Sequence, residues 1–280
     1  MSRNRDRVGM GNQRPDTSNP PPQALQQENP GFSFVIPTEF VELPSEGKFY
    51  PEGHPLHNVG NIEIKQMTAK EEDILTSRTL VKKGVALDRV IQSLIIDKAI
   101  DPASLLIGDR NAILIACRVS AYGNDYTTEI QCPVCETRQK YEFDLNSAVI
   151  YDGSDVDTLN IEYNNNGTFD THLPKSQVTA TFKLLTGRDE KILLDIFKTQ
   201  EHAVSTHLRN MIVAVNGDSS GQTLNYMVEN LPSMDARHLR LAYRLAAPNI
   251  DLSQNFECEE CDYEQKMEVP LSADFFWPNE

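Results

Sequence analysis

Two Cys-x-x-Cys pairs constrain the fold of this chain more than any other feature. The first pair is Cys132 and Cys135, and the second is Cys258 and Cys261. Thiolates spaced in this way both reach one metal ion from a tight turn, so each pair supplies half of a tetrahedral four-cysteine zinc site. In a local zinc ribbon the two pairs lie about 15–20 residues apart, whereas Cys258 follows Cys132 by 126 residues. A shared metal would therefore join two distant parts of the chain.

Other residues recur at the same separation. The matching pairs are Leu105 and Leu231, Asp109 and Asp235, Arg118 and Arg244, Lys140 and Lys266, Glu142 and Glu268, and Leu145 and Leu271. Further upstream the offset is 118, where MTAKEEDIL (67–75) aligns with LTGRDEKIL (185–193). We interpret the chain as two diverged copies of one unit. Chance similarity between short blocks is the alternative.

The predicted fold class is α+β, with two repeats of strands and helices. Each repeat ends in a CxxC β-hairpin, or zinc knuckle, and the two hairpins share a structural zinc site. Residues 1–30 are rich in Pro, Asn and Gln and too polar to offset the entropy of ordering, so they are predicted to form a disordered arm. Residues 31–148 form the first repeat. Residues 149–280 form an acidic, Asn-rich linker and hairpin followed by the second repeat.

Local patterns place the elements of both repeats. Thr68 and Glu71 have the spacing of a capping box at the start of a helix. Apolar spacing predicts further helices over 87–97 and 108–119 in the first repeat, and helices are also expected over 188–198, 202–215 and 234–245 in the second. NNNG between IEY and TFDTHL predicts a hairpin turn, because Asn and Gly tolerate positive φ.

Composition excludes several classes of protein. A net charge of −15 makes a general phosphate-binding surface unfavourable. The chain has no apolar run long enough to span a bilayer, and its first residues lack the apolar core of a secretory signal, so a cytoplasmic location is expected. A reducing cytoplasm disfavours disulfides and therefore favours metal binding by the cysteines.

Four cysteines without an obvious further ligand predict a closed structural site for one Zn²⁺ per chain. A redox CxxC is a competing interpretation, as are two separate half-sites or a lost metal. Cys117 is expected to be a small buried apolar residue, and His202 and His207 are expected to have surface or core roles. No phosphate loop, serine nucleophile motif or HExxH is present, so the chain is not expected to be an enzyme.

Five blocks stand in order along the first half of the chain: LPSEGKFY (43–50), IEIKQMTAKEEDIL, LVKKG, LLIGDRNAILIACRVSAYGNDY and CPVC. Together they resemble the baseplate hub proteins of T4-like contractile-tailed phages, and the resemblance is best over about 40–145. The resemblance implies a structural or assembly component of the central baseplate hub, located in the virion tail or in the host cytoplasm during assembly. It implies other hub and tail proteins as partners, with no small-molecule substrate, nucleic acid or membrane insertion. The alternative is a zinc-ribbon nucleic-acid-binding regulatory protein.

Overall fold

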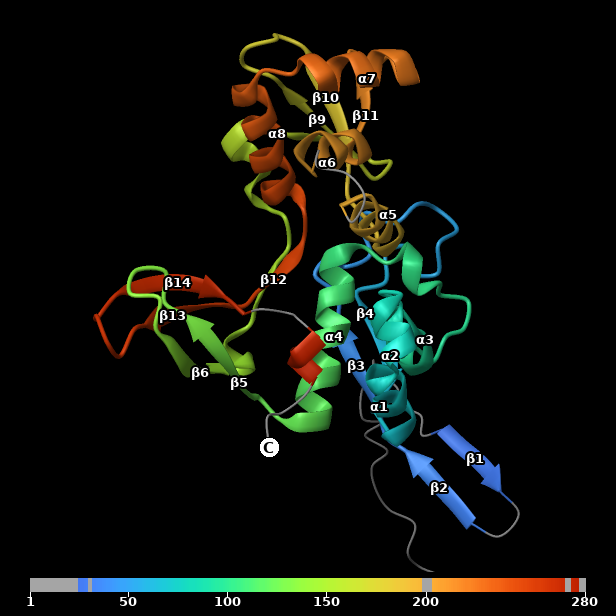
Figure 1. Cartoon of the computed structure of the whole chain (residues 1–280). Coiled ribbons are helices and arrows are strands. Elements are labelled where there is room, and N and C mark those ends of the chain that lie inside the picture. Colours follow the sequence, from blue (N-terminus) through green and yellow to red (C-terminus); the bar gives the residue numbers. More distant parts are fainter. Residues whose placement is uncertain (1–24, 30–31, 198–202, 270–272, 277–280) are drawn as a thin grey trace, which may run out of the picture.

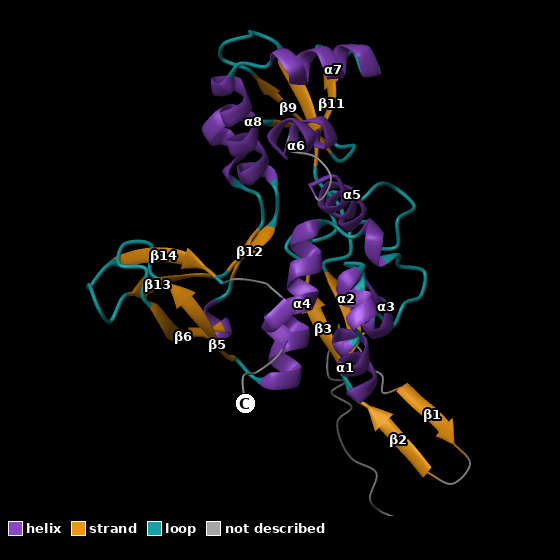
Figure 2. Cartoon of the chain, in the orientation of Figure 1, coloured by secondary structure: helices purple, strands orange, loops and turns teal. Residues whose placement is uncertain are grey.

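The computed structural model describes residues 25–29, 32–197, 203–269 and 273–276. Helices and strands are mixed, as the sequence predicts (Figures 1 and 2). The helices are α1 Ala69–Thr76, α2 Arg78–Lys82, α3 Ala86–Leu94, α4 Ile107–Tyr122, α5 Gly187–Phe197, α6 Ala203–Met211, α7 Gly221–Asn230 and α8 Ser233–Ala246. The strands are β1 Leu25–Asn29, β2 Phe32–Ile36, β3 Thr38–Glu42, β4 Asn61–Lys65, β5 Asp125–Gln131, β6 Arg138–Asp144, β7 Val149–Tyr151, β8 Glu162–Tyr163, β9 Thr168–His172, β10 Thr179–Lys183, β11 Ile212–Val215, β12 Asn249–Asp251, β13 Ser253–Glu257 and β14 Glu264–Glu268.

The structure differs from the predicted disordered arm at its C-terminal end. Leu25–Asn29 form β1, which pairs antiparallel with β2 so that Leu25 lies opposite Ile36. This pairing satisfies backbone groups that an arm without structure would leave to water. Residues 1–24 and 30, the rest of the predicted arm, lie outside the described residues.

In the first half of the chain, α4 packs against β3 of the β3–β4 hairpin, and α1 packs against α3 (Figure 1). The predicted capping box is confirmed, because Thr68 and Glu71 make both of its reciprocal contacts at the start of α1. In α3, the predicted apolar face is buried at Val90, Ile91 and Leu94. Burying such side chains contributes roughly 1.5–3 kcal/mol each, which explains why this short helix is stable here.

The start of helix α4 contacts segments from the second half of the chain. The backbone N–H of Ile107 donates to the carbonyl of Leu185 at 3.1 Å, and that of Gly187 donates to Leu105 at 2.9 Å. Gly108 allows the backbone to approach closely, since a Cβ at this position would lie 1.9 Å from the carbonyl oxygen of Pro248. The start of α4 is therefore fixed against both the α5 and β12 regions.

The second half contains an antiparallel sheet in the order β11-β10-β9-β8. The predicted NNNG turn is confirmed between β8 and β9, with positive φ at Asn165 and Gly167. The predicted helix over 202–215 is wrong at its end, because Ile212–Val215 form β11 and pair with β10. Three of these four residues are β-branched and suit a pleated strand better than a helix.

The chain then returns to a pair of hairpins beside the first half (Figure 1). Strand β7 pairs with β12, which brings the segments after α4 and after α8 together. Hairpin β5–β6 precedes β7 in the sequence, and hairpin β13–β14 directly follows β12. Among the described residues, no helix combines the length and apolar character that crossing a membrane requires.

Candidate metal centre

The four predicted ligands lie on the turns of two hairpins. Cys132 and Cys135 connect β5 to β6, and Cys258 and Cys261 connect β13 to β14. Cys132 and Cys258 are fully buried, whereas Cys135 and Cys261 are exposed. The second cysteine of each pair therefore lies at the surface and the first lies against the core.

The first turn is closed by backbone hydrogen bonds around Cys132. Its N–H donates to the carbonyl of Thr137 at 2.9 Å, and its carbonyl accepts from the N–H of Glu136 at 3.0 Å. Glu136 has φ of +60°, which lets the chain reverse directly after Cys135. The N–H of Val134 donates to the Cys132 sulfur at 3.4 Å.

The second turn repeats these backbone contacts. The N–H of Cys258 donates to Tyr263 at 2.9 Å, and its carbonyl accepts from Asp262 at 3.0 Å. Asp262 has φ of +53° and follows Cys261, as Glu136 follows Cys135. Both turns thus present their two sulfurs from the same local conformation.

The sulfurs of the two turns meet in one cluster. All four lie within 4.8 Å of one another. The sulfur of Cys132 is 3.7 Å from that of Cys261, and the sulfur of Cys135 is 3.6 Å from that of Cys258. A tetrahedral zinc with Zn–S bonds of about 2.3 Å separates its sulfurs by about 3.8 Å. The observed separations fit that arrangement and are far longer than a disulfide bond.

The electrostatics of the cluster favour a cation. Hydrogen bonds that its sulfur accepts from the hydroxyl and N–H of Thr137 lower the pKa of Cys135 to about 6. For Cys261, the backbone hydrogen bond from Tyr263 lowers the pKa, but desolvation and the neighbouring thiols raise it to about 12. Thiolates this close repel one another, so full deprotonation of the cluster requires a positive charge among them. The donor set fits a four-coordinate ion that prefers sulfur.

Side chains hold the two hairpins together outside the sulfur cluster. Gln139 donates to the carbonyl of Glu257 at 3.0 Å and accepts from the N–H of Glu259 at 3.1 Å. Gln254 accepts from the N–H of Asp144 at 3.1 Å and donates to its carbonyl at 2.8 Å. The hairpins therefore have a polar interface that orients the cysteines.

The remaining candidate side chains lie elsewhere. Cys117 is buried in α4, and burial raises the pKa of its thiol, in agreement with an apolar role. His207 stands edge-on to Tyr243 with ring centroids 6.2 Å apart, and desolvation followed by the charge of Arg240 lowers its pKa. His202 lies outside the described residues.

Two buried carboxylates have structural roles that the sequence did not predict. Asp109, in the first turn of α4, accepts from the N–H of Ser45 at 3.0 Å, from its hydroxyl at 2.6 Å and from Tyr50 at 2.7 Å. Asp235, in the first turn of α8, accepts from the N–H groups of Lys175 and Ser176 at 2.9 and 2.8 Å. Each acid joins a helix to the loop that follows a strand. The match between the two aspartates in the sequence could have indicated that they have the same role.

A second pair of matched acids caps α1 and α5. Glu71 accepts from Lys65 at 2.8 Å and from the Thr68 hydroxyl at 2.6 Å. At the offset of 118 residues, Asp189 accepts from Lys183 at 2.7 Å and from the Thr186 hydroxyl at 2.8 Å. Asp189 therefore accepts hydrogen bonds from a lysine and a threonine, as Glu71 does, and the three residues of each set lie at matching positions in the sequence.

The chain belongs to a phage baseplate family. A family model described as "T4 bacteriophage base plate protein" matches residues 36–277, which is most of the chain. This result confirms the resemblance to T4-like baseplate proteins that the sequence blocks indicate, and it extends through both cysteine pairs. Searches of curated proteins and of solved structures found no match. Family membership supports a structural role in a phage baseplate and an association with phage tail proteins.

Proposed function

We propose that this protein is a structural or assembly component of the central baseplate hub of a contractile-tailed, T4-like phage. It acts through contacts with other hub and tail proteins, in the virion tail or in the host cytoplasm during assembly. The observation that carries this proposal is the family match over residues 36–277. The resemblance of residues 40–145 to hub proteins supports the more specific assignment. An enzymatic activity is not part of the proposal.

We further propose that Cys132, Cys135, Cys258 and Cys261 bind one structural Zn²⁺ per chain. The mutual separations of the four sulfurs, all within 4.8 Å, support tetrahedral coordination. All four positions around the ion would be filled by protein, so no coordination position would remain for a substrate. The metal would link two hairpins that are far apart in the sequence and would give the assembled protein a fixed surface in that region.

The duplicated organisation is also a proposal. The first repeat would comprise residues 31–148, and residues 149–280 would comprise the linker and the second repeat. Support comes from the matching backbone hydrogen bonds of the two cysteine turns and from the matched carboxylate contacts of Asp109 and Asp235. In this arrangement each repeat contributes one zinc knuckle to the shared site.

A nucleic-acid-binding role is less well supported by the composition of the second hairpin. Glu259 and Glu260 stand between its cysteines, and Asp262 follows them, where phosphate contact would require Lys or Arg. Tight, salt-sensitive binding of DNA in a filter-binding assay would favour that role over the hub proposal.

The hub proposal is tested by deleting the gene from the phage and by mass spectrometry of purified wild-type virions. Loss of the gene should abolish tail assembly, and the wild-type chain should bind other hub proteins stoichiometrically. Detection of the chain in virions would identify a hub subunit, whereas its absence from virions would identify an assembly factor. Normal tails without the gene, and no association with hub proteins, would contradict both.

A further inference from the structure

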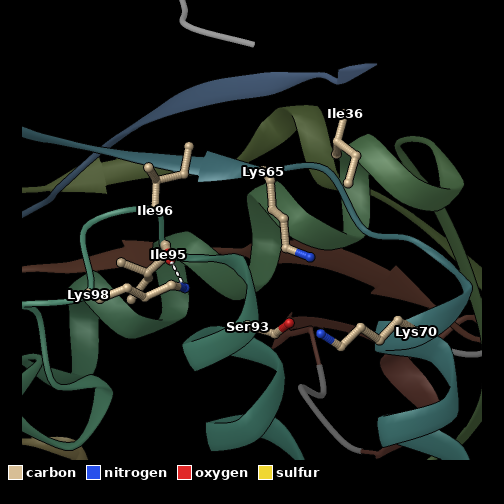
Figure 3. A pocket seen from close by; sticks show the side chains of 7 residues that line it. All are labelled: Ile36, Lys65, Lys70, Ser93, Ile95, Ile96 and Lys98. Carbon is tan, nitrogen blue, oxygen red and sulfur yellow. Dashed lines mark hydrogen bonds between the residues drawn. The ribbon is translucent and has the colours of Figure 1, made fainter. Parts of the chain in front are cut away.

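A pocket of about 350 Å³ lies between β4, α1 and the C-terminal end of α3. Figure 3 shows its lining, in which lysine side chains approach the hydroxyl of Ser93 from two sides. The lining residues are Ile36, Lys65, Lys70, Ser93, Ile95, Ile96 and Lys98. Basic groups and apolar walls are thus combined in one concave site, separate from the cysteine cluster.

The pocket has an excess of positive charge. Lys65 is paired with the buried carboxylate of Glu71 at 2.8 Å. Lys98 donates to the carbonyls of Gln92 and Ile95, which are neutral. Within the described parts of the chain, no carboxylate lies within ion-pair distance of Lys70. Two of the three lysine charges are therefore not neutralised by an acid.

The lysines also affect one another. Burial lowers the pKa of Lys98, and the charges of Lys65 and Lys70 lower it further. An anion bound between these groups would remove that repulsion. This concentration of positive charge is unusual in a chain whose net charge is −15.

We propose that this lysine pocket binds the carboxylate of an acidic residue in another phage tail protein. The carboxylate would lie between Lys70 and Lys98, and an apolar residue next to it would contact Ile96, the isoleucine of the lining that is partly exposed. This inference rests on the proposed function, since it names the chemistry by which a tail partner is recognised. A compact carboxylate suits a small pocket, whereas a nucleic acid would meet repulsion from the rest of this acidic chain. Lys70 and Lys98 are both exposed and are therefore accessible to a partner's carboxylate.

Zero-length coupling with a carbodiimide tests the contact directly, because it forms an amide only between an amine and a carboxylate that touch. The full-length, metal-containing chain is mixed with tail proteins from phage-infected cells, coupled, digested and analysed by mass spectrometry. The expected product joins Lys70 or Lys98 to an identified Asp or Glu of another tail protein. An amide from these lysines only to a second copy of the chain would overturn the proposed partner.

Paired variants measure the contribution of the pocket. Lys70→Glu with Lys98→Glu should weaken binding of the coupled protein at least tenfold, and the neutral Lys70→Gln with Lys98→Gln should weaken it less. Lys82→Glu with Lys83→Glu makes the same charge change at exposed positions outside the pocket and should leave binding unchanged. Thermal midpoints confirm that each variant is folded.

Failure of the pocket can be distinguished from failure of the proposed function. If tail proteins bind the wild-type chain but couple only through other lysines, and the pocket variants bind equally well, the pocket proposal is overturned and the hub proposal stands. If the wild-type chain binds no tail protein, both are overturned.

Discussion

The sulfur of Cys132 lies 3.7 Å from the sulfur of Cys261, although 129 residues separate them in the sequence. The first cysteine of one hairpin therefore faces the second cysteine of the other, and the reverse holds for Cys135 and Cys258. This crossed arrangement follows from two turns of the same conformation that meet face to face. It makes each hairpin dependent on the other for a complete set of ligands.

Replacing any one ligand should remove the metal from the whole cluster. Cys258→Ser leaves three sulfurs in place of four, so we expect less than a tenth of the wild-type zinc content and a lower thermal midpoint. Zinc is measured by its release to a chromogenic chelator. Cys117→Ala is the matched control, since it removes a buried thiol outside the cluster and should retain one zinc per chain. Full zinc retention by Cys258→Ser would contradict the assigned ligand set.

Metal removal should loosen the two hairpins more than the rest of the fold. Without a cation, the four sulfurs no longer hold β5–β6 against β13–β14, and only the polar side-chain contacts remain. Hydrogen exchange of the amides after chelation should therefore rise in these strands and stay low in β3 and β4, which lie apart from the cluster. Equal exchange in all of these strands before and after chelation would show that the metal has no structural role.

The buried acids Asp109 and Asp235 should each be important for stability. Removing Asp109 leaves the N–H and hydroxyl of Ser45 without their acceptor, and a buried unsatisfied group costs about 1–3 kcal/mol. We expect Asp109→Ala and Asp235→Ala each to lower the free energy of unfolding by about 2–4 kcal/mol in urea titrations. Asp73→Ala, at an exposed position in α1, should change it by less than about 0.5 kcal/mol. Equal effects of all three substitutions would contradict this role.

Acid should destabilise the protein partly through Glu71. Burial would raise the pKa of this carboxyl, but hydrogen bonds from Lys65, Ser93 and Thr68 lower it to about 2. The pKa is thus depressed on folding, so the stabilisation is complete above the unfolded value of about 4.3 and is lost as the pH falls toward 2. The lost stabilisation is on the order of 3 kcal/mol. Glu71→Gln should flatten the stability profile between pH 5 and 2, and an unchanged slope would contradict the account.

Two glycine substitutions should have opposite effects. Gly108→Ala places a Cβ within 1.9 Å of the Pro248 carbonyl oxygen, so α4 and the β12 region must separate, and we expect a loss of more than about 3 kcal/mol. In Gly221→Ala the added Cβ meets no atom within 4 Å beyond its own part of the chain. This substitution should leave the free energy of unfolding unchanged or raise it by up to about 1 kcal/mol. Thermal unfolding of both variants checks this, and equal midpoints would argue against the close packing at Gly108.

The elements that could be predicted were those with a strong local signal. The capping box at Thr68 and the apolar spacing of Val90 and Leu94 depend on neighbouring residues, and the helices formed there. The proximity of the four cysteines could be predicted, because two thiolate pairs with this spacing are suited to share one metal ion. Zinc binding by these cysteines stays a prediction.

The remaining features depend on tertiary contacts. The segment from Ile212 to Val215 directly follows a helix, but its β-branched residues suit a strand and it pairs with β10. Helix α7 was not predicted, although Ser220 is an N-cap that accepts from the N–H of Thr223. The pocket containing Lys70 and Lys98 is lined by residues from separate elements. The spacing of apolar residues along the sequence does not predict which elements come together in this way.

Elemental analysis of the purified full-length chain, combined with alkylation of its native state, tests the central claim most directly. The account predicts one zinc per chain and four cysteines protected from alkylation until the metal is removed. Cys135 and Cys261 are exposed, so burial alone would not protect them. A zinc content near zero, with these two cysteines alkylated freely in the native protein, would contradict the shared four-cysteine site.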